Sequence, residues 1–279
     1  MFSVDFTQIG LATPEKTARM GTGAASLNYY VKNKDGEFLV KFLSNNRPME
    51  KFRKNLTKIS GLKNAPVFLY ETTFQDYHVF VFKWIEGKYV FLEKLSENGF
   101  RELVRAYLNF SQEINENPPV VVDPFYDMTK AVVSFTPPFF IKGELEKIKK
   151  DLSYTPPPHL KIIHGDFHFK NILFKQDGFQ GFLDFETVRY GLPTEDLIRL
   201  ILTNAEQHNF FREKYTLNLL KIMMEETPYS KEEWLYGLDS FILLKYQKRI
   251  IHKKNSIRQK FLMFYNNYLY SKIRRTIQG

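Results

Sequence analysis

The chain has 279 residues, of which 43% are hydrophobic and 25% charged, so it is long and apolar enough to bury the core of one large domain or of two lobes. It contains no cysteine, which excludes disulfide bonds, thiolate catalysis and cysteine-ligated zinc, and its formal net charge is +9. The N-terminal residues lack a basic segment followed by an apolar one, and no apolar run approaches the roughly 18 residues of a membrane span, so we expect a cytoplasmic protein.

Residues 20–43 predict a glycine-rich hairpin. A turn that contains Gly21 and Gly23 precedes one apolar strand, and an Asp-Gly turn leads into a second. The two glycines would let backbone N–H groups approach phosphate oxygens, and Ser26 would add a hydroxyl donor. A plain flexible turn has the same composition, so this hairpin alone does not identify a nucleotide site.

Lys41 interrupts the second, apolar strand of this hairpin. Because a lysine inside a buried strand is costly unless it is paired, Lys41 is a candidate functional residue. Its partner should be a carboxylate on the next helix. Residues 49–60 have apolar residues at helical spacing, and Glu50 lies in the first turn of this predicted helix. The alternative for Glu50 is a solvated surface residue near a helix N-terminus.

Two strands follow, at residues 65–72 and 78–87, and helical patterns then take over. The second strand ends in Lys-Trp-Ile-Glu-Gly, which we interpret as the connection between two lobes. An apolar stripe predicts a helix over residues 100–114, and a charged helix is predicted over residues 143–152. Residues 118–142 are rich in Pro and Phe without a clear period, and no element is predicted there.

Residues 162–186 carry the strongest signal for chemistry. An apolar strand leads into a His-Gly-Asp sequence that ends at Asp166, Asn171 follows five residues later, and a short hairpin ends at Asp184. Phosphoryl transfer uses such a set, in which one carboxylate accepts the proton of the attacking hydroxyl and an amide with a second carboxylate holds Mg²⁺ against the phosphates of ATP. An aspartate after a strand is often only a turn or a helix cap, so it is the combination of all three residues that predicts a kinase site.

This combination resembles the catalytic loop and the metal-binding aspartate of the kinase-like fold. Gly165 in place of an arginine, and Asp184-Phe185-Glu186 in place of Asp-Phe-Gly, are similar to the aminoglycoside phosphotransferase and choline kinase family. The resemblance implies an α+β, two-lobed protein-kinase-like fold. We expect a β-rich N-lobe with one helix over residues 1–83, and a mainly helical C-lobe with the catalytic loop over residues 84–279.

The resemblance also implies roles for individual residues. Asp166 would be the base or the group that orients the hydroxyl, and Asn171 and Asp184 would bind Mg²⁺. Lys170 would neutralise charge on the transferring phosphoryl group, unless it is simply a solvated lysine. ATP would be bound by Gly21, Gly23, Ser26, Lys41 held by Glu50, the main chain of Lys83 and Ile85, and Leu173.

Two further residues are expected to support the catalytic loop. His164 would orient it through ring hydrogen bonds. In the family a further aspartate before the next helix braces the loop, and Asp196 matches it, with Glu195 as the less favoured choice. Asp196 follows Asp184 by only 12 residues and no Ala-Pro-Glu sequence is present, so a protein kinase activation segment is missing and a protein substrate is not expected.

The family implies an alcohol acceptor on a small molecule. Asp-Phe-Glu favours choline or ethanolamine, whereas His-Gly-Asp favours sugars and aminoglycosides. The basic C-terminal end favours an anionic acceptor instead, such as a phosphorylated sugar or the core of a lipopolysaccharide, and this is our leading prediction. A catalytically inactive nucleotide-binding module is a different class, against which the complete set of Lys41, Asp166, Asn171 and Asp184 argues.

The whole excess of positive charge lies in residues 240–279, which hold ten Lys or Arg and no Asp or Glu. This asymmetry suggests a polyanionic partner or surface, but nothing resembles a module that reads nucleic-acid bases, so nucleic acid is not expected. The pattern predicts either a helix on the anionic inner face of a membrane or, equally, a helix packed onto the C-lobe with solvated lysines. The apolar residues concerned are Phe261, Leu262, Phe264, Tyr265, Tyr268, Leu269 and Tyr270.

Overall fold

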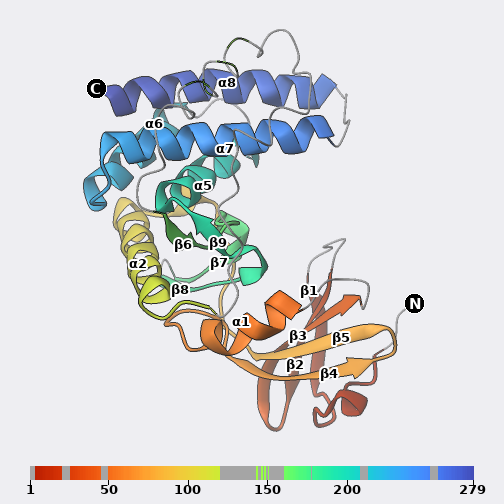
Figure 1. Ribbon diagram of the computed structural model, residues 1–279. Coiled ribbons are helices and arrows are strands. Elements are labelled where there is room, and N and C mark those ends of the chain that lie inside the picture. Colours follow the sequence, from red (N-terminus) through yellow and green to blue (C-terminus); the bar gives the residue numbers. More distant parts are fainter. Residues whose placement is uncertain are drawn as a thin grey trace.

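An antiparallel β-sheet and a mainly helical region follow one another along the chain (Figure 1). The computed structural model describes residues 4–20, 26–44, 50–119, 160–176, 178–207, 213–251 and 257–279, together with residues 143, 146, 148 and 150. The predicted α+β class, with a β-rich N-lobe and a mainly helical C-lobe, is confirmed.

The N-lobe is a five-stranded antiparallel sheet in the order β1-β2-β3-β5-β4. The predicted hairpin forms β2 and β3, whose turn contains Gly36 at a φ of 141°, a value that favours glycine. The edge strand β1 was not predicted. The register places Asn28 of β2 and Phe80 of β5 on either side of Lys41 in β3. The strands are β1 (Lys16–Met20), β2 (Ser26–Asn33), β3 (Gly36–Ser44), β4 (Phe68–Phe74) and β5 (Tyr77–Lys83).

Both faces of this sheet are covered, because side chains alternate between the faces along each strand. Val40 and Phe42 face one cluster, which packs on the 3₁₀ turn η1 (Phe6–Ile9). Leu39 and Leu43 face the other, which packs on helix α1 (Glu50–Ser60). Lys41 alternates with Val40 and Phe42 and therefore points to the side of α1.

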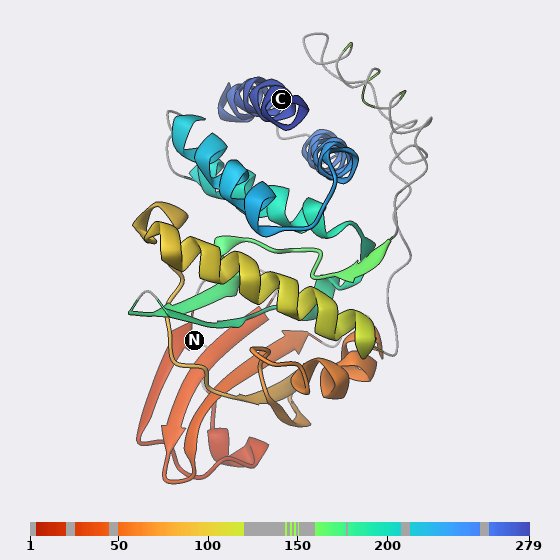
Figure 2. The ribbon, with the colours of Figure 1, turned by 90° about the vertical axis from the view of Figure 1, so that its left-hand side faces the viewer.

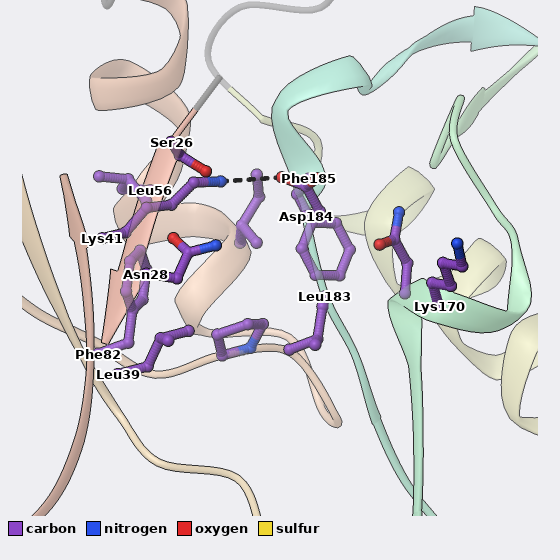
Figure 3. Close-up of a pocket in the computed structure, with 13 residues that line it drawn as sticks. Ser26, Asn28, Leu39, Lys41, Leu56, Phe82, Lys170, Leu183, Asp184 and Phe185 are labelled. Carbon is purple, nitrogen blue, oxygen red and sulfur yellow. Dashed lines mark hydrogen bonds and ion pairs between the residues drawn. The ribbon is translucent and has the colours of Figure 1, made fainter. Parts of the chain in front are cut away.

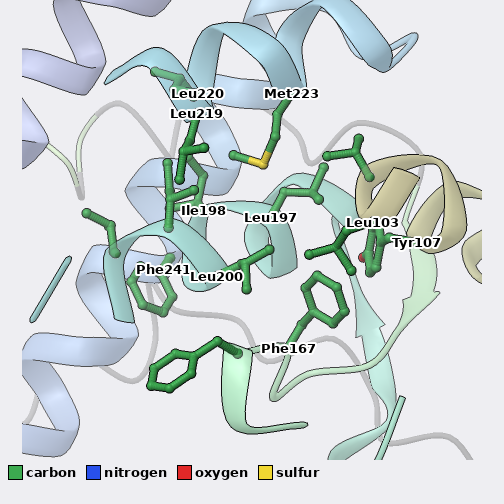
Figure 4. Packing of buried hydrophobic residues seen from close by; sticks show 14 of the residues in the cluster. Leu103, Tyr107, Phe167, Leu197, Ile198, Leu200, Leu219, Leu220, Met223 and Phe241 are labelled. Atoms are coloured by element: carbon green, nitrogen blue, oxygen red, sulfur yellow. The ribbon is translucent and has the colours of Figure 1, made fainter. Parts of the chain in front are cut away.

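The C-lobe is built around helix α5, of which only three of 15 residues are not buried. Leucines and isoleucines of α5 pack with aromatic residues from the other helices and from the catalytic loop (Figure 4). Helices α7 and α8 lie side by side at the end of the molecule remote from the N-lobe (Figures 1 and 2). The helices are α2 (Glu97–Glu116), α5 (Pro193–Gln207), α6 (Glu213–Glu226), α7 (Lys231–Ile251) and α8 (Ile257–Gln278).

Short strands and 3₁₀ turns between α2 and α5 carry the predicted motif. In Figure 2, α2 runs alongside these strands on the side turned to the viewer. The strands pair as β6 with β9 and β7 with β8, both antiparallel. The elements are β6 (Lys161–Ile163), η4 (Phe169–Asn171), β7 (Ile172–Lys175), β8 (Gly178–Phe182), η5 (Phe185–Thr187) and β9 (Arg189–Gly191), with η2 (Leu92–Lys94) before α2.

The two lobes touch at a second place besides the chain connection after Lys83. The backbone N–H of Lys63 donates to the Glu113 carboxylate of α2 at 3.0 Å, and the N–H of Phe182 donates to the carbonyl of Asn64 at 2.8 Å. Leu62 packs in the core of the C-lobe. The loop after α1 therefore fixes the N-lobe against α2 and β8.

The strand predicted over residues 78–87 ends earlier, at Lys83, and the other sequence predictions agree with the described elements. The helices predicted over residues 49–60 and 100–114 correspond to α1 and α2, and residues 143, 146, 148 and 150 are helical. Most of residues 118–142, where no element was predicted, lies outside the described part of the chain. Among the described helices, none has the length and apolar composition needed to cross a membrane.

Candidate active site

The catalytic loop begins where β6 ends, and hydrogen bonds to Asp196 of α5 fix its backbone. The Asp196 carboxylate accepts hydrogen bonds from the backbone N–H groups of His164 at 2.8 Å and Gly165 at 3.1 Å, and from the Tyr107 hydroxyl at 3.0 Å. Burial raises the pKa of Asp196, although the charges of Arg199 and Arg189 and the hydrogen bond from Tyr107 oppose this effect. The prediction that Asp196 braces the loop is confirmed, whereas Glu195 pairs with Arg189.

His164 connects this loop to the strand end that carries Asp184. Its buried ring places Nε2 at 2.8 Å from the carbonyl of Leu183 and Nδ1 at 3.4 Å from the backbone N–H of Asp166. Because Nε2 faces an acceptor and Nδ1 faces a donor, this environment suits the neutral ring with its hydrogen on Nε2. The predicted orienting role of His164 is confirmed.

Gly165 is required by the backbone of the loop. Its φ is +80°, and a Cβ built on it would lie 2.2 Å from the carbonyl oxygen of Thr187. We expect Gly165→Ala to lower the free energy of unfolding by at least about 1–3 kcal/mol, from backbone strain alone, and to lower activity by displacing Asp166. Thermal unfolding measures this loss. Gly143→Ala is the control, because a Cβ there meets open space and alanine suits a helix; equal stability of the two variants would contradict the prediction.

Two nitrogen groups contact the carboxylate of Asp166, one at each oxygen. Arg199 Nη1 of α5 lies 3.3 Å from Oδ1, and His168 Nε2 lies 3.3 Å from Oδ2. Burial alone would raise the pKa of Asp166, but the hydrogen bond with His168 and the charge of Arg199 outweigh it and lower the pKa to about 2. Because of this low pKa, the carboxylate is ionised at neutral pH. Its side chain is 36% exposed, so the carboxylate is accessible to another molecule.

Asn171 and Asp184 are brought together by the β7–β8 hairpin. Asn171 ends the 3₁₀ turn before β7, and its backbone carbonyl accepts the N–H of Leu183 at 2.8 Å, just before Asp184. The Asn171 amide donates through Nδ2 to the Asp166 carbonyl at 3.0 Å, which leaves Oδ1 as the atom able to bind a cation. Asp184 has a φ of 65°, an uncommon conformation that aspartate tolerates better than most residues.

Lys41 crosses from the sheet to the carboxylates of the C-lobe. Its Nζ lies 3.0 Å from Asp184 Oδ1 and also forms an ion pair with Glu186. Burial alone would lower the pKa of Lys41, but the charges of Asp184 and Glu186 outweigh it and raise the pKa. Lys41 is therefore protonated and able to bind an anion.

The predicted pairing of Lys41 with Glu50 is not formed between these two described residues. Glu50 is the first residue of α1, its side chain is 80% exposed, and it pairs with Lys54 one turn later. The physical reason is local: a glutamate followed four residues later by a lysine makes a favourable pair on the helix itself. Lys41 takes its partners from the Asp-Phe-Glu segment instead.

Lys41, Asn171 and Asp184 line a cavity of about 220 Å³ between the two lobes. Figure 3 shows Lys41 pointing across the cavity to Asp184, with Asn28 and Leu39 on the sheet side and Lys170 on the loop side. The cavity combines a polar end with an apolar end, as expected for a ligand that has a charged part and a flat apolar part. It is lined by Ser26, Asn28, Leu39, Lys41, Leu56, Ile59, Pro66, Phe82, Lys170, Asn171, Leu183, Asp184 and Phe185.

A profile of the phosphotransferase enzyme family matches residues 16–223, well over half of the chain. The chain belongs to this family. It is a small-molecule kinase, as the sequence motif predicted, and the helices of residues 224–279 lie beyond the matched region. No curated protein matches the sequence.

Solved structures of phosphotransferases share the fold. One is a thermostable mutant of the aminoglycoside phosphotransferase APH(4)-Ia with ADP and hygromycin B, at a TM-score of 0.69, 10% identity and 98% coverage of both chains. Spectinomycin phosphotransferase APH(9)-Ia with ADP and spectinomycin has a TM-score of 0.64 and 12% identity, covering 96% of this chain and 94% of that one. A choline/ethanolamine kinase family protein from Mesorhizobium loti has a TM-score of 0.64 and 15% identity, covering 95% and 93%. The two-lobed kinase-like fold is therefore confirmed.

Of the other residues predicted to bind ATP, Ser26 lines the cavity, whereas Lys83, Ile85 and Leu173 are not among its lining residues, and Gly21 and Gly23 lie outside the described part of the chain. Lys170, predicted to act on the transferring phosphoryl group, also lines the cavity. The segment after Lys83 is fixed on β7 by paired backbone hydrogen bonds of 2.9 Å between Lys88 and Phe174. This contact brings the connection between the lobes close to Leu173, whose Cβ would lie 3.1 Å from a Cβ built on Gly87.

Sequence reasoning missed three polar residues of this phosphotransferase site. Glu186 was noted only as part of a family motif, yet it pairs with Lys41. His168 and Arg199 were not assigned to Asp166, although both contact its carboxylate. Arg199 interrupts the apolar run of residues 197–202, and this charged position was a signal that could have indicated a buried partner.

The C-terminal helices use most of their described apolar residues for packing. Tyr265, Leu269 and Tyr270 are buried in the core of the C-lobe, and only Tyr268 of the described set is exposed. The side chains of Phe261, Leu262 and Phe264 lie outside the described part. Several cations are also paired with carboxylates, namely Lys245 with Glu206, Lys272 with Glu213 and Arg274 with Asp239. For the described residues, packing onto the C-lobe is the alternative that fits.

Proposed function

We propose that this phosphotransferase transfers the γ-phosphate of ATP to a hydroxyl group of a small molecule or sugar. The observation that carries the proposal is the convergence of Lys41, Asn171 and Asp184 on one cavity, beside the loop that carries an ionised Asp166. Phosphoryl transfer needs positioning and charge stabilisation rather than a protein nucleophile, and these residues provide both.

Lys41 and the two oxygen ligands would bind the phosphates. Protonated Lys41 would contact phosphate oxygens, and Ser26 would add a hydroxyl donor. The Asn171 amide oxygen and the Asp184 carboxylate fit Mg²⁺, which prefers oxygen ligands and takes few of them from the protein. Bound Mg²⁺ would neutralise charge on the phosphates. Among the described residues no cluster of three or more His, Cys, Asp and Glu forms a separate metal site.

Asp166 would act on the acceptor. In the transfer, the acceptor oxygen forms a bond to the γ-phosphorus, the bond to the leaving ADP oxygen breaks, and the hydroxyl proton is released. With a pKa of about 2, the carboxylate is a weak base at neutral pH. It is therefore better suited to orienting the hydroxyl and taking the proton late, when the hydroxyl has become acidic through bond formation.

The adenine would lie against the connection between the lobes. The Lys83 N–H is used in a 2.9 Å bond to Val67, so Lys83 would contribute its carbonyl, and Ile85 would contribute its N–H. Leu173 would form the apolar floor under the base. The proposal for these three residues rests on their common position where the connection is fixed on β7.

For the acceptor, we infer a neutral or anionic sugar, such as a phosphorylated sugar or the core of a lipopolysaccharide. Near the catalytic loop, the described carboxylates of Asp166 and Glu195 are each paired with a largely buried arginine. A cationic acceptor gains little from carboxylates that are already neutralised. Choline, ethanolamine and aminoglycosides remain the alternative acceptors, and contact of the basic C-terminal end with an anionic membrane surface stays a prediction.

The experiment that tests the function is a product screen. The purified protein is incubated with ATP, Mg²⁺ and extracts of metabolites or cell envelope, and mass spectrometry looks for an acceptor that gains one phosphoryl group. A defined panel of a neutral sugar, a sugar phosphate, choline and an aminoglycoside then assigns the charge class. Nucleotide binding without turnover of any acceptor would favour an inactive binding module instead.

Lys41→Ala and Glu50→Ala form a matched pair of predictions. We expect Lys41→Ala to reduce kcat/KM for ATP by about 10- to 100-fold, the worth of a charged hydrogen bond. Glu50→Ala should change it by only a few-fold, because an exposed ion pair contributes little. Steady-state kinetics with varied ATP measures both variants. A loss for Glu50→Ala as large as that for Lys41→Ala would show that Glu50 does hold Lys41 when ATP is bound.

A further inference from the structure

Arg199 joins the helical core of the C-lobe to the catalytic carboxylate. It lies on α5 three residues after Asp196, so both side chains are on the face of the helix below the catalytic loop. Only 9% of Arg199 is exposed, its Nη1 lies 3.3 Å from Asp166 Oδ1, and its guanidinium carbon lies 5.2 Å from the centre of the Phe241 ring of α7. The guanidinium is thus held between an aromatic ring and Asp166.

The second oxygen of Asp166 is held by a residue of the loop itself. His168 Nε2 lies 3.3 Å from Asp166 Oδ2, and His168 Nδ1 accepts the backbone N–H of Lys170 at 3.2 Å. Because Nδ1 acts as an acceptor, the ring hydrogen lies on Nε2 and is donated to Asp166. Of the two groups that hold the carboxylate, only Arg199 comes from a rigid, buried element.

Stability alone does not account for Arg199. A buried guanidinium must be desolvated, and replacing a buried ion pair by apolar residues of similar volume is often neutral or stabilising. Its neighbours along α5 are buried leucines and isoleucines, and its guanidinium lies against Phe241, so an apolar residue would suit this part of the helix. In addition, Arg199 Nε is buried without a hydrogen-bond partner among the described residues. Burying this arginine therefore costs folding free energy, and the residue lies beside Asp166, the group proposed to meet the acceptor.

We propose that Arg199 is a positioning residue for phosphoryl transfer, which holds the Asp166 carboxylate in one orientation toward the acceptor hydroxyl. The inference rests on the proposed function, because it assigns to Arg199 the alignment of the group that meets the acceptor. Without the guanidinium, the carboxylate is held by His168 of the loop alone and can rotate. Misalignment then lowers the rate of transfer and leaves the binding of ATP unchanged, because Asp166 contacts the acceptor and Lys41 the phosphates.

The test compares Arg199→Met, Arg199→Lys and a matched control, Arg274→Met. Methionine keeps the apolar stem against Phe241 and removes the charge, whereas lysine keeps the charge. We expect Arg199→Met to lower kcat by about 10- to 100-fold, the effect of a small misplacement of reacting groups, with KM for ATP within about threefold. Arg199→Lys should recover part of the rate. Arg274→Met removes another buried pair, with Asp239 at 2.7 Å, and should lower the unfolding temperature without lowering kcat.

The readouts are ADP release in the presence of the acceptor found by the product screen, ADP release with water as the acceptor, and thermal unfolding. A native chain that turns over no ATP with any acceptor contradicts the proposed function, and this inference with it. A native chain that is active, with Arg199→Met keeping kcat within about twofold, contradicts the inference alone. So does a loss of kcat in Arg199→Met that Arg274→Met reproduces, because the loss then follows from stability. A selective loss of kcat with partial rescue by lysine supports it.

Discussion

Asp166→Asn is expected to lower kcat by about 10²- to 10⁴-fold, the range found when a positioned acid–base group is removed. Asparagine keeps the size of the side chain but loses the charge and replaces one oxygen by a hydrogen-bond donor. That donor would face Arg199 or His168, which both contact the native carboxylate. The acceptor hydroxyl would then have no anionic group to align it.

The affinity for ATP should remain within a few-fold in Asp166→Asn, because Asp166 is not among the residues that line the cavity with Lys41. Titration of the nucleotide by calorimetry separates this effect from unfolding, and a thermal scan reports the cost of leaving Arg199 without its anion. Asp76→Asn, at an exposed turn between β4 and β5, is the control for the substitution itself. Transfer by Asp166→Asn near the native rate would remove Asp166 from its role.

Asp184→Asn is expected to abolish most activity by weakening the binding of Mg²⁺ with ATP. Asparagine is a more informative substitution than alanine, because Asp184 has a φ of 65° and asparagine tolerates this backbone conformation, so the change removes the charge without adding backbone strain. Loss of the anionic ligand removes part of a charge stabilisation worth several kcal/mol, so a loss of about 10³-fold in kcat/KM is expected.

The diagnostic measurement for Asp184→Asn is the dependence of activity and nucleotide binding on Mg²⁺ concentration. The native chain should reach half-maximal activity at a lower Mg²⁺ concentration than the variant, and high Mg²⁺ should restore part of the rate. Glu186→Gln is the matched control, because Glu186 also contacts Lys41 but is not predicted to be a metal ligand. An unchanged Mg²⁺ dependence in Asp184→Asn would move the metal site to other residues.

The sequence by itself determined the chemistry of the site, because the residues concerned are close together along the chain. A strand, a turn and a short hairpin place Asp166, Asn171 and Asp184 at spacings that local geometry dictates. The same holds for Lys41, whose position in an apolar strand identifies it as unusual without any knowledge of the fold. The α+β class also followed from local patterns, since the sheet and the helices occupy separate parts of the chain.

Only the tertiary structure decided which charges meet. Lys41 pairs with Asp184 and Glu186, which are more than 140 residues away, and not with Glu50 on the next helix. Arg199 reaches Asp166 because Asp196, on the same face of α5, is bound to the loop. No local pattern specifies such pairs, since the path of the chain between distant elements depends on the packing of the whole core.

The aromatic residues of the C-terminal end illustrate the same limit. An apolar stripe on a helix has the same sequence pattern whether it faces a membrane or a protein core. Burial of Tyr265, Leu269 and Tyr270 against the C-lobe is decided by the surface that α7 and its neighbours present to α8. That surface is assembled from segments far apart in the sequence, so it exists only in the folded chain.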